Sequence, residues 1–214
     1  MTKDSFLAIN TCGLTQVLLK DGGEFLYFST LERQAASTML LDKVNQMLTE
    51  KEVDLSKLKS LAVCVGPGSF TGIRVGVSAV RALGFALNKP IIPVTYFDIL
   101  AYEYYDKLKN SEFFCVLDGK SGVCYVKKYN GFKSEKNKNN KPFCAKNSDL
   151  RAILGDKTVV ADSVFDPILS DCLLSNGGSE GFCLAIKNGI EQNYLSILPL
   201  YLRKSQPERG SGDI

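Results

Sequence analysis

Short apolar runs bounded by turn residues alternate with longer segments of helical spacing in the first half of the chain. The apolar runs predict strands, at 6–9, 16–19, 24–28, 61–65 and 91–94. The longer segments predict helices, over 31–50, 71–87 and 96–109. Asp21-Gly22-Gly23 indicates a hairpin between the second and third strands. The order β-β-β-α-β-α-β-α therefore predicts a mixed sheet with helices on its faces, which is an α/β fold.

The second half of the chain begins the same pattern again, more weakly. Strands are predicted over 113–117 and 123–129, a short helix over 148–154 and another strand over 158–161. We therefore expect two related lobes, an N-terminal lobe over 1–109 and a smaller C-terminal lobe over 110–214.

Composition excludes several kinds of chemistry. The chain of 214 residues contains no His, so Ser-His-Asp and Cys-His catalysis, His-ligated metals and an imidazole base are ruled out. The net charge of +3 is too small to indicate nucleic-acid binding by itself. Seven Cys without a C-x-x-C pair indicate neither a zinc site nor a redox motif. Free thiols, no signal-peptide pattern and no uninterrupted apolar run of about 18 residues favour a cytoplasmic protein without a membrane segment.

The first two predicted helices are more apolar than packing on one sheet face requires. The second also contains several glycines, and glycine within a helix costs about 1 kcal/mol relative to Ala, so a close backbone approach is expected there. Either the helices pack on each other as well as on the sheet, or part of their surface docks another subunit. The docking hypothesis predicts an interface made of Ala36, Met39, Lys43, Met47, Gly72, Gly76, Ala79 and Leu83. It also predicts that Gly76→Arg abolishes association and leaves the monomer folded.

A glycine-rich loop joins the fourth predicted strand to the second helix. Such a loop can direct backbone N–H groups at an anion. However, no Lys-Ser/Thr follows Gly72, and Thr71 stands where a dinucleotide fingerprint needs Gly. The loop chemistry alone favours a tight turn with Ser69 or Thr71 capping the helix. The candidate loop residues are Gly66, Pro67, Gly68, Ser69, Thr71, Gly72 and Arg74.

A segment rich in Lys and Asn lies in the second half, where Lys127 to Lys141 contains six Lys and one Glu. A solvated loop and a nucleic-acid contact both remain open for it, and the stretch 133–141 has no assigned role.

The loop Gly66-Pro67-Gly68-Ser69-Phe70-Thr71-Gly72-Ile73-Arg74-Val75-Gly76 resembles the signature of the bacterial TsaB (YeaZ) family. Four other segments resemble the family's opening strand and turn, its strand after the signature helix, its Asp-x-Arg-x-x-x-x-Tyr segment and its Pro-x-Tyr-x-Arg end. They are 6–12, 91–95, 118–125 and 199–203.

This resemblance implies an actin-like, sugar-kinase-like fold (ASKHA, ribonuclease-H-like) of two lobes, the second reduced. It also implies a non-catalytic subunit in the formation of threonylcarbamoyladenosine at tRNA position 37 (t6A37). The family is similar in fold to TsaD, which transfers threonylcarbamoyl and binds its metal through His. The implied partners are a TsaD-like transferase and a TsaE-like ATPase, with tRNA contacted indirectly and a homodimer when the chain is isolated. The first two helices form the family's association surface.

The chain departs from the family pattern at the turn after its first strand. Asn10 and Cys12 stand in place of the usual Asp and Ser, and Lys120 stands where Arg is common. A neutral amide binds a divalent cation poorly, so we expect no metal site, no catalytic residue and no cofactor held by this chain alone. The resemblance allows a nucleotide only in the complex. The alternative hypothesis is a small ATP-binding phosphotransferase or ATPase that uses the glycine-rich loop.

Overall fold

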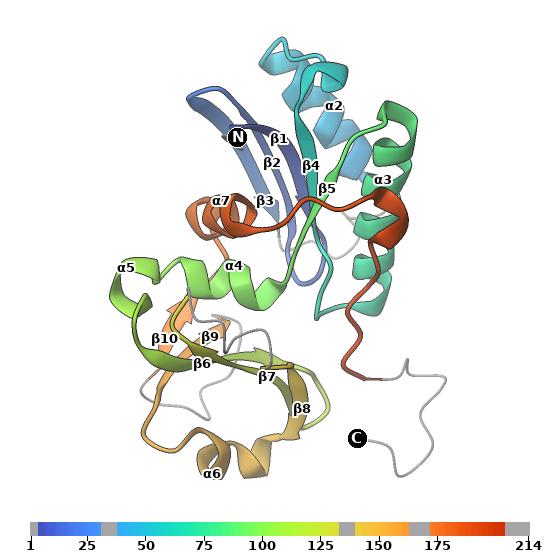
Figure 1. Ribbon diagram of the computed structural model, residues 1–214. Helices are drawn as coiled ribbons and strands as arrows, with labels where there is room; N and C mark the ends of the chain where they lie inside the picture. The colour runs from blue at the N-terminus through green and yellow to red at the C-terminus, as the bar shows by residue number, and fades with distance from the viewer. Residues whose placement is uncertain (1–3, 31–37, 133–139, 163–171, 204–214) are drawn as a thin grey trace. The chain divides into compact units, whose positions relative to one another are not determined.

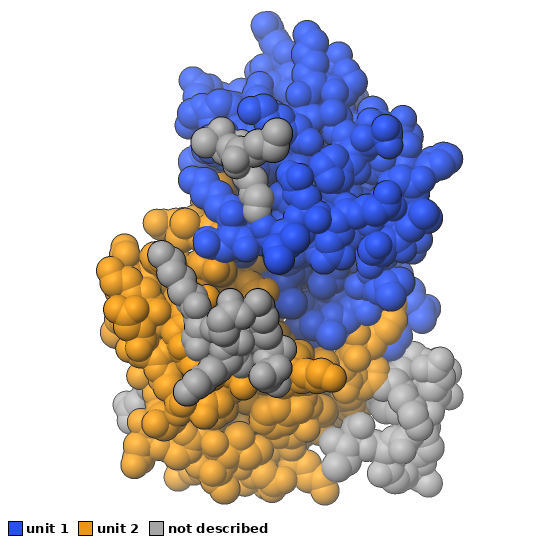
Figure 2. Space-filling view, in the orientation of Figure 1, with its two compact units in different colours: residues 1–96, 185–200 blue, residues 97–184, 201–214 orange. Residues whose placement is uncertain are grey.

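The computed structural model describes residues 4–30, 38–132, 140–162 and 172–203. The chain forms two compact units, coloured separately in Figure 2. Unit 1 comprises residues 1–96 and 185–200, and unit 2 comprises residues 97–184 and 201–214. Each unit is built around its own five-stranded sheet.

The sheet of unit 1 has the strand order β3-β2-β1-β4-β5 (Figure 1). Its first three strands form an antiparallel meander, and β1, β4 and β5 run parallel to one another. The strands are β1 (Ser5–Asn10), β2 (Thr15–Asp21), β3 (Glu24–Thr30), β4 (Ser60–Cys64) and β5 (Ile91–Val94). Both faces of β1 and β4 are buried, which explains their continuous apolar sequences. The predicted mixed sheet is confirmed.

Two helices cover one face of this sheet, α2 (Leu40–Glu50) and α3 (Phe70–Leu87). Lys43 of α2 lies over the ring of Phe28. Phe28 pairs with Val17, and Val17 pairs with Ile9, so these three side chains lie on the same face of the sheet. A Cβ at Gly76 of α3 would lie 3.6 Å from Cγ2 of the same Ile9. The opposite face is covered by the segment that returns to unit 1, because a Cβ at Gly189 would lie 2.5 Å from Cγ2 of Ile92.

Helix α3 is long and apolar enough to cross a membrane by length and composition, with a mean hydropathy of 1.3 over its 18 residues. It is interrupted by Arg74 and Arg81, and its glycine-bearing side packs against strands of unit 1. The two arginines agree with the absence of an uninterrupted apolar run, and 33% of the helix is buried within the structure.

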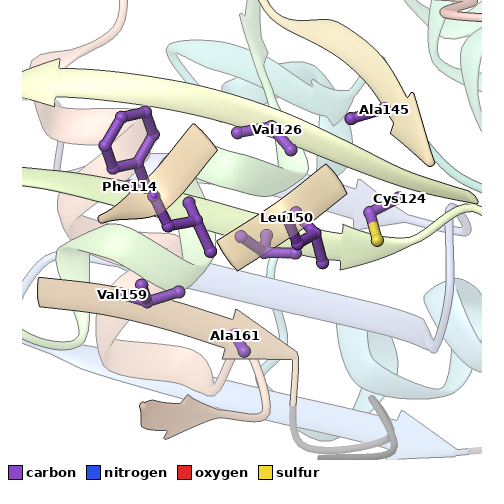
Figure 3. Close-up of a cluster of buried hydrophobic side chains, with 9 residues drawn as sticks. Phe114, Cys124, Val126, Ala145, Leu150, Val159 and Ala161 are labelled. Atoms are coloured by element: carbon purple, nitrogen blue, oxygen red, sulfur yellow. The ribbon is translucent and has the colours of Figure 1, made fainter. Parts of the chain in front are cut away.

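The sheet of unit 2 repeats the topology of unit 1, with the order β10-β9-β6-β7-β8. Here too an antiparallel meander is followed by parallel strands. The strands are β6 (Glu112–Asp118), β7 (Val123–Asn130), β8 (Phe143–Lys146), β9 (Thr158–Asp162) and β10 (Leu173–Ser175). One face of this sheet packs on the short helix α6 (Leu150–Leu154), and Figure 3 shows Leu150 among Phe114, Val126 and Val159. The expected pair of related lobes is confirmed at the level of topology.

Unit 2 is reduced in its helices. Along the chain, helix α6 lies between the third and fourth strands of unit 2 and has five residues. At the same place in unit 1, helix α2 has 11 residues. The sequence did not predict β8, β10 or the helix α7 (Ser179–Asn188), which contains Gly181 in its first turn. The helix expected over 96–109 is divided into α4 (Tyr96–Tyr102) and α5 (Tyr105–Leu108).

The residues that make up the two compact units differ from the two lobes expected from the sequence, which were divided at residue 109. Residues 97–109 belong to unit 2, because Asp98 of α4 accepts hydrogen bonds from Lys127 and Tyr129 of β7. Residues 185–200 belong to unit 1, where Gln192 forms a bridge with Ile91 of β5. A boundary drawn from the linear pattern misses this return of the chain.

Candidate functional site

The glycine-rich loop forms the N-terminal end of α3. Ser69 is the N-cap, and its Oγ accepts a hydrogen bond from the N–H of Gly72 at 3.3 Å. The sequence allowed either Ser69 or Thr71 as the helix cap, and Ser69 is the one that caps it. The Gly66–Pro67 peptide bond is cis, and the carbonyl of Gly66 accepts a hydrogen bond from the N–H of Tyr96 at 2.8 Å.

The loop packs directly against the turn that follows β1. The N–H of Ser69 donates to the carbonyl of Cys12 at 2.6 Å, and the Thr11 hydroxyl donates to the carbonyl of Gly72 at 2.6 Å. A Cβ at Gly68 would lie 2.2 Å from the Cys12 oxygen, and one at Gly72 would lie 1.9 Å from the Thr11 oxygen. Gly68 also has a φ of +158°. These glycines therefore serve a close backbone approach within unit 1.

A chain of neutral hydrogen bonds fills the turn from the other side. Asn10 is fully buried, its Oδ1 accepts from the N–H of Cys12 at 2.9 Å, and its Nδ2 donates to Gln16 Oε1 at 2.6 Å. Gln16 is also fully buried, and its Nε2 donates to the Tyr27 hydroxyl at 2.7 Å. The two buried amides are thus used inside the sheet. Sequence reasoning singled out Asn10 but missed Gln16 and Tyr27, because their alignment depends on strand register.

Across residues 4–30, 38–132, 140–162 and 172–203, no group of three or more Cys, Asp or Glu side chains is arranged to hold a metal ion. The cysteines in unit 2 that are buried are also poor nucleophiles. Burial raises the pKa of Cys124 to about 12, with Asp118 and Cys144 adding to the effect. Burial raises the pKa of the Cys115 thiol further above its usual range. These thiols therefore stay protonated near neutral pH.

The exposed surface of α3 differs from the predicted docking stripe. Gly72 and Gly76 are buried, and Gly76 faces Thr11, whose Oγ1 would lie 2.3 Å from an added Cβ. Ala79 and Leu83 are only partly buried and lie at the edge of the helix surface. The inclusion of Gly72 and Gly76 in a docking face is therefore wrong, since the helix turns its glycines toward its own sheet.

The outer face of α3 consists of its exposed residues, and Arg74 is the only charged one among them. They are Thr71, Arg74, Ser78, Ala82, Phe85 and Ala86. The Arg74 guanidinium lies 5.2 Å from the centroid of the Phe70 ring. The outer face thus carries three polar and three apolar side chains with a single charge, which is compatible with contact with another chain.

Helix α2 presents only part of its predicted share of the interface. Met39 is 45% exposed, whereas Met47 is 3% exposed and packs inside unit 1. Lys43 is half-buried over Phe28. Ala36 lies outside the described residues.

Two of the segments that carry the resemblance meet in unit 2. Arg203 donates from Nη1 to the carbonyls of Gly119 and Lys120, at 3.3 and 3.2 Å. In the same turn, the Asp118 carboxylate accepts hydrogen bonds from the backbone N–H and the Nζ of Lys120. Asp118 is thus paired within its own turn. Of the Lys-rich stretch 133–141, residues 133–139 lie outside the described residues.

These observations define an α/β protein of two lobes that share one sheet topology, in which the backbone of α3 packs against the turn after the first strand. Residues 31–154 match the family model of TsaD, tRNA N6-adenosine threonylcarbamoyltransferase, and this is more than half of the chain. The chain belongs to this family, and its resemblance to the TsaB (YeaZ) members is confirmed by the following similarities.

The chain is 25% identical over 103 residues to the tRNA threonylcarbamoyladenosine biosynthesis protein TsaB of Haemophilus influenzae, which is 48% of this chain and 44% of that protein. It is 28% identical over 129 residues to TsaB of Bacillus subtilis, covering 58% and 55%. Its identity to the tRNA N6-adenosine threonylcarbamoyltransferase of Staphylococcus aureus is 32% over 113 residues, covering 44% and 33%. The chain thus spans about half the length of the TsaB relatives it matches, and a third of the transferase.

The fold is similar to that of a solved structure over nearly the whole chain. YeaZ from Pseudomonas aeruginosa superposes with a TM-score of 0.69 at 22% identity, covering 93% of this chain and all of that one. The expected two-lobed fold class is confirmed by this likeness.

Proposed function

We propose that this protein is a non-catalytic subunit required for t6A37 formation in tRNA, which binds and supports a TsaD-type transferase together with a TsaE-type ATPase. The observation that carries the proposal is the occupied first-strand turn. The backbone of α3 lies against Thr11 and Cys12, and the amide of Asn10 is used inside the sheet. Family membership supports the pathway, and this geometry supports a non-catalytic role.

Three features of the chain support the non-catalytic role in this proposal. It has no His to hold a metal in the manner that the resemblance implies for the transferase. Asn10 carries no charge to attract a divalent cation. The N–H of Ser69, which a phosphate-binding loop would direct outward, donates to Cys12. The last feature also counts against the alternative of an ATP-binding phosphotransferase.

The partner surface in this proposal is the outer face of α3, with Ala79 and Leu83 at its edge and with Met39 and Lys43 of α2. Small side chains at Ser78 and Ala82 let a partner helix approach closely. The isolated chain uses the same face to form a homodimer. The chain holds no cofactor alone, a nucleotide enters only with the complex, tRNA is contacted through the partner, and the complex works in the cytoplasm.

The proposal is tested by co-purification and light scattering with the chain's own TsaD-type transferase. Ala82→Glu places a charge in the centre of the outer face of α3, so association should be lost while the melting temperature stays near that of wild type. Ala152→Glu makes the same change at an exposed position of α6 and should bind as wild type does. Native binding by Ala82→Glu contradicts the assignment of this face.

A further inference from the structure

The largest exposed apolar side chain of α3 lies at one side of the outer face, next to the segment that returns to unit 1. Phe85 is 69% exposed, and its ring meets that of Tyr194 edge-on, with the centroids 5.6 Å apart. Tyr194 begins the short turn η4 (Tyr194–Ser196), which packs beside α3 (Figure 1). Arg81 secures this packing, because its Nε donates to the Tyr194 carbonyl at 3.2 Å. The segment is therefore held on the helix by side-chain contacts.

Two further apolar side chains extend from this held segment into solvent. Leu195 is 67% exposed and Leu198 is 68% exposed, although Ile197 between them is buried. We define Phe85, Leu195 and Leu198 as the C-terminal patch. Exposed large apolar residues on neighbouring segments of secured backbone are typical of protein–protein contacts, whereas single scattered ones need no explanation.

The position of the C-terminal patch relates it to the outer face of α3. At about 100° per residue, Ser78 and Ala82 lie between Phe85 on one side of the helix and Ala79 and Leu83 on the other. Phe85 belongs both to the outer face and to the patch, and its contact with Tyr194 links the outer face to the returning segment.

We infer that the surface docking the transferase partner continues from α3 onto the returning segment 194–198, with Phe85, Leu195 and Leu198 as apolar anchors. The occupant is the same partner chain, presenting apolar side chains, because the patch is continuous with the outer face of α3. No acidic residue occurs in α3 or between 194 and 203, so a partner surface that carries carboxylates fits this region best. This inference rests on the proposed function.

The contact is first tested on the unaltered proteins by hydroxyl-radical footprinting of the chain with and without its TsaD-type transferase. Phe85, Leu195 and Leu198 should each be protected at least threefold in the complex, and Phe25, which is 50% exposed on β3, should react equally in both samples. Unchanged reactivity of all three patch residues in a complex that has formed overturns the inference.

Substitutions give an independent measurement by calorimetry with the same transferase. Leu195→Asp and Leu198→Asp should each raise Kd at least tenfold, and the control Phe25→Asp should leave it unchanged. If both patch variants bind natively while Ala82→Glu does not, the patch is outside the interface and the proposed function survives. If Ala82→Glu also binds natively, the proposed interface fails as well. Any patch variant that melts early is judged by the footprinting result.

Discussion

Replacing Gly76 by Ala tests the finding that α3 turns its glycines inward. Ala is the better helix former by about 1 kcal/mol, so the substitution is stabilising if position 76 faces solvent or a partner. In the structure the new Cβ lies 2.3 Å from Thr11 Oγ1, closer than non-bonded atoms can approach. Thr11 must then move, and its 2.6 Å hydrogen bond to Gly72 is lost or lengthened.

The magnitude follows from these opposing effects. Overpacking in a core costs about 1–3 kcal/mol, and a lost hydrogen bond costs about 1 kcal/mol more. After the helix gain of about 1 kcal/mol, Gly76→Ala should be destabilised by about 2 kcal/mol. For a chain of this length that lowers the melting temperature by about 4–8 °C.

The assay is thermal and urea unfolding of wild type, Gly76→Ala and the control Ser78→Ala. The control introduces Ala on the exposed side of α3. Ser78→Ala should melt at or slightly above the wild-type temperature. Adding Thr11→Ala to Gly76→Ala removes the clashing hydroxyl. The double variant should therefore lose less free energy of unfolding than the sum of the losses in the two single variants. A Gly76→Ala variant that melts at or above wild type refutes the inward assignment.

Three other outcomes are expected. Asn10→Asp should lower stability, because the new oxygen faces Gln16 Oε1 in the buried network. It should also create no nucleotide hydrolysis, and a gain of hydrolysis in a phosphate-release assay contradicts the account of the turn. Burial, assisted by Asp98, raises the pKa of Tyr129 well above 10, so the folded state keeps it neutral while the unfolded state ionises. Stability should therefore fall as pH rises above about 10, and it should fall less steeply in Tyr129→Phe. Urea unfolding midpoints from pH 8 to 11 measure this, and equal slopes of midpoint against pH for the two proteins refute this cause. Deleting 133–141 should leave complex formation and modification intact, and a loss of tRNA affinity above tenfold at physiological salt shows instead that this stretch holds phosphates.

The strand pattern of unit 1 was predictable because each strand is a distinct apolar run bounded by turn residues. In unit 2, β8 and β10 are short and α7 carries a glycine, so local signals are weak and tertiary packing decides. The return of 185–200 to unit 1 could not be predicted, since a single bridge between Ile91 and Gln192 leaves no periodic trace.

The orientation of α3 shows a similar limit for the site. Glycines within a helix correctly predict a close backbone approach, but the sequence does not say whose backbone approaches. Here it is the turn at Thr11, inside the same unit. The apolar surplus of α3 was recognisable, whereas Phe85, Leu195 and Leu198 became a group only through the Phe85–Tyr194 contact across 109 positions of chain.

The central claim, that this chain supports a transferase and performs no chemistry itself, is tested most directly by measuring t6A formation on unmodified tRNA with purified components. The purified chain alone, supplied with the threonylcarbamoyl donor, should form no t6A. Product should appear when the TsaD-type and TsaE-type proteins are added, and it should fall to the level of those two alone when Ala82→Glu replaces the wild-type chain. Robust turnover by the chain alone, removed by a substitution within it, contradicts the account.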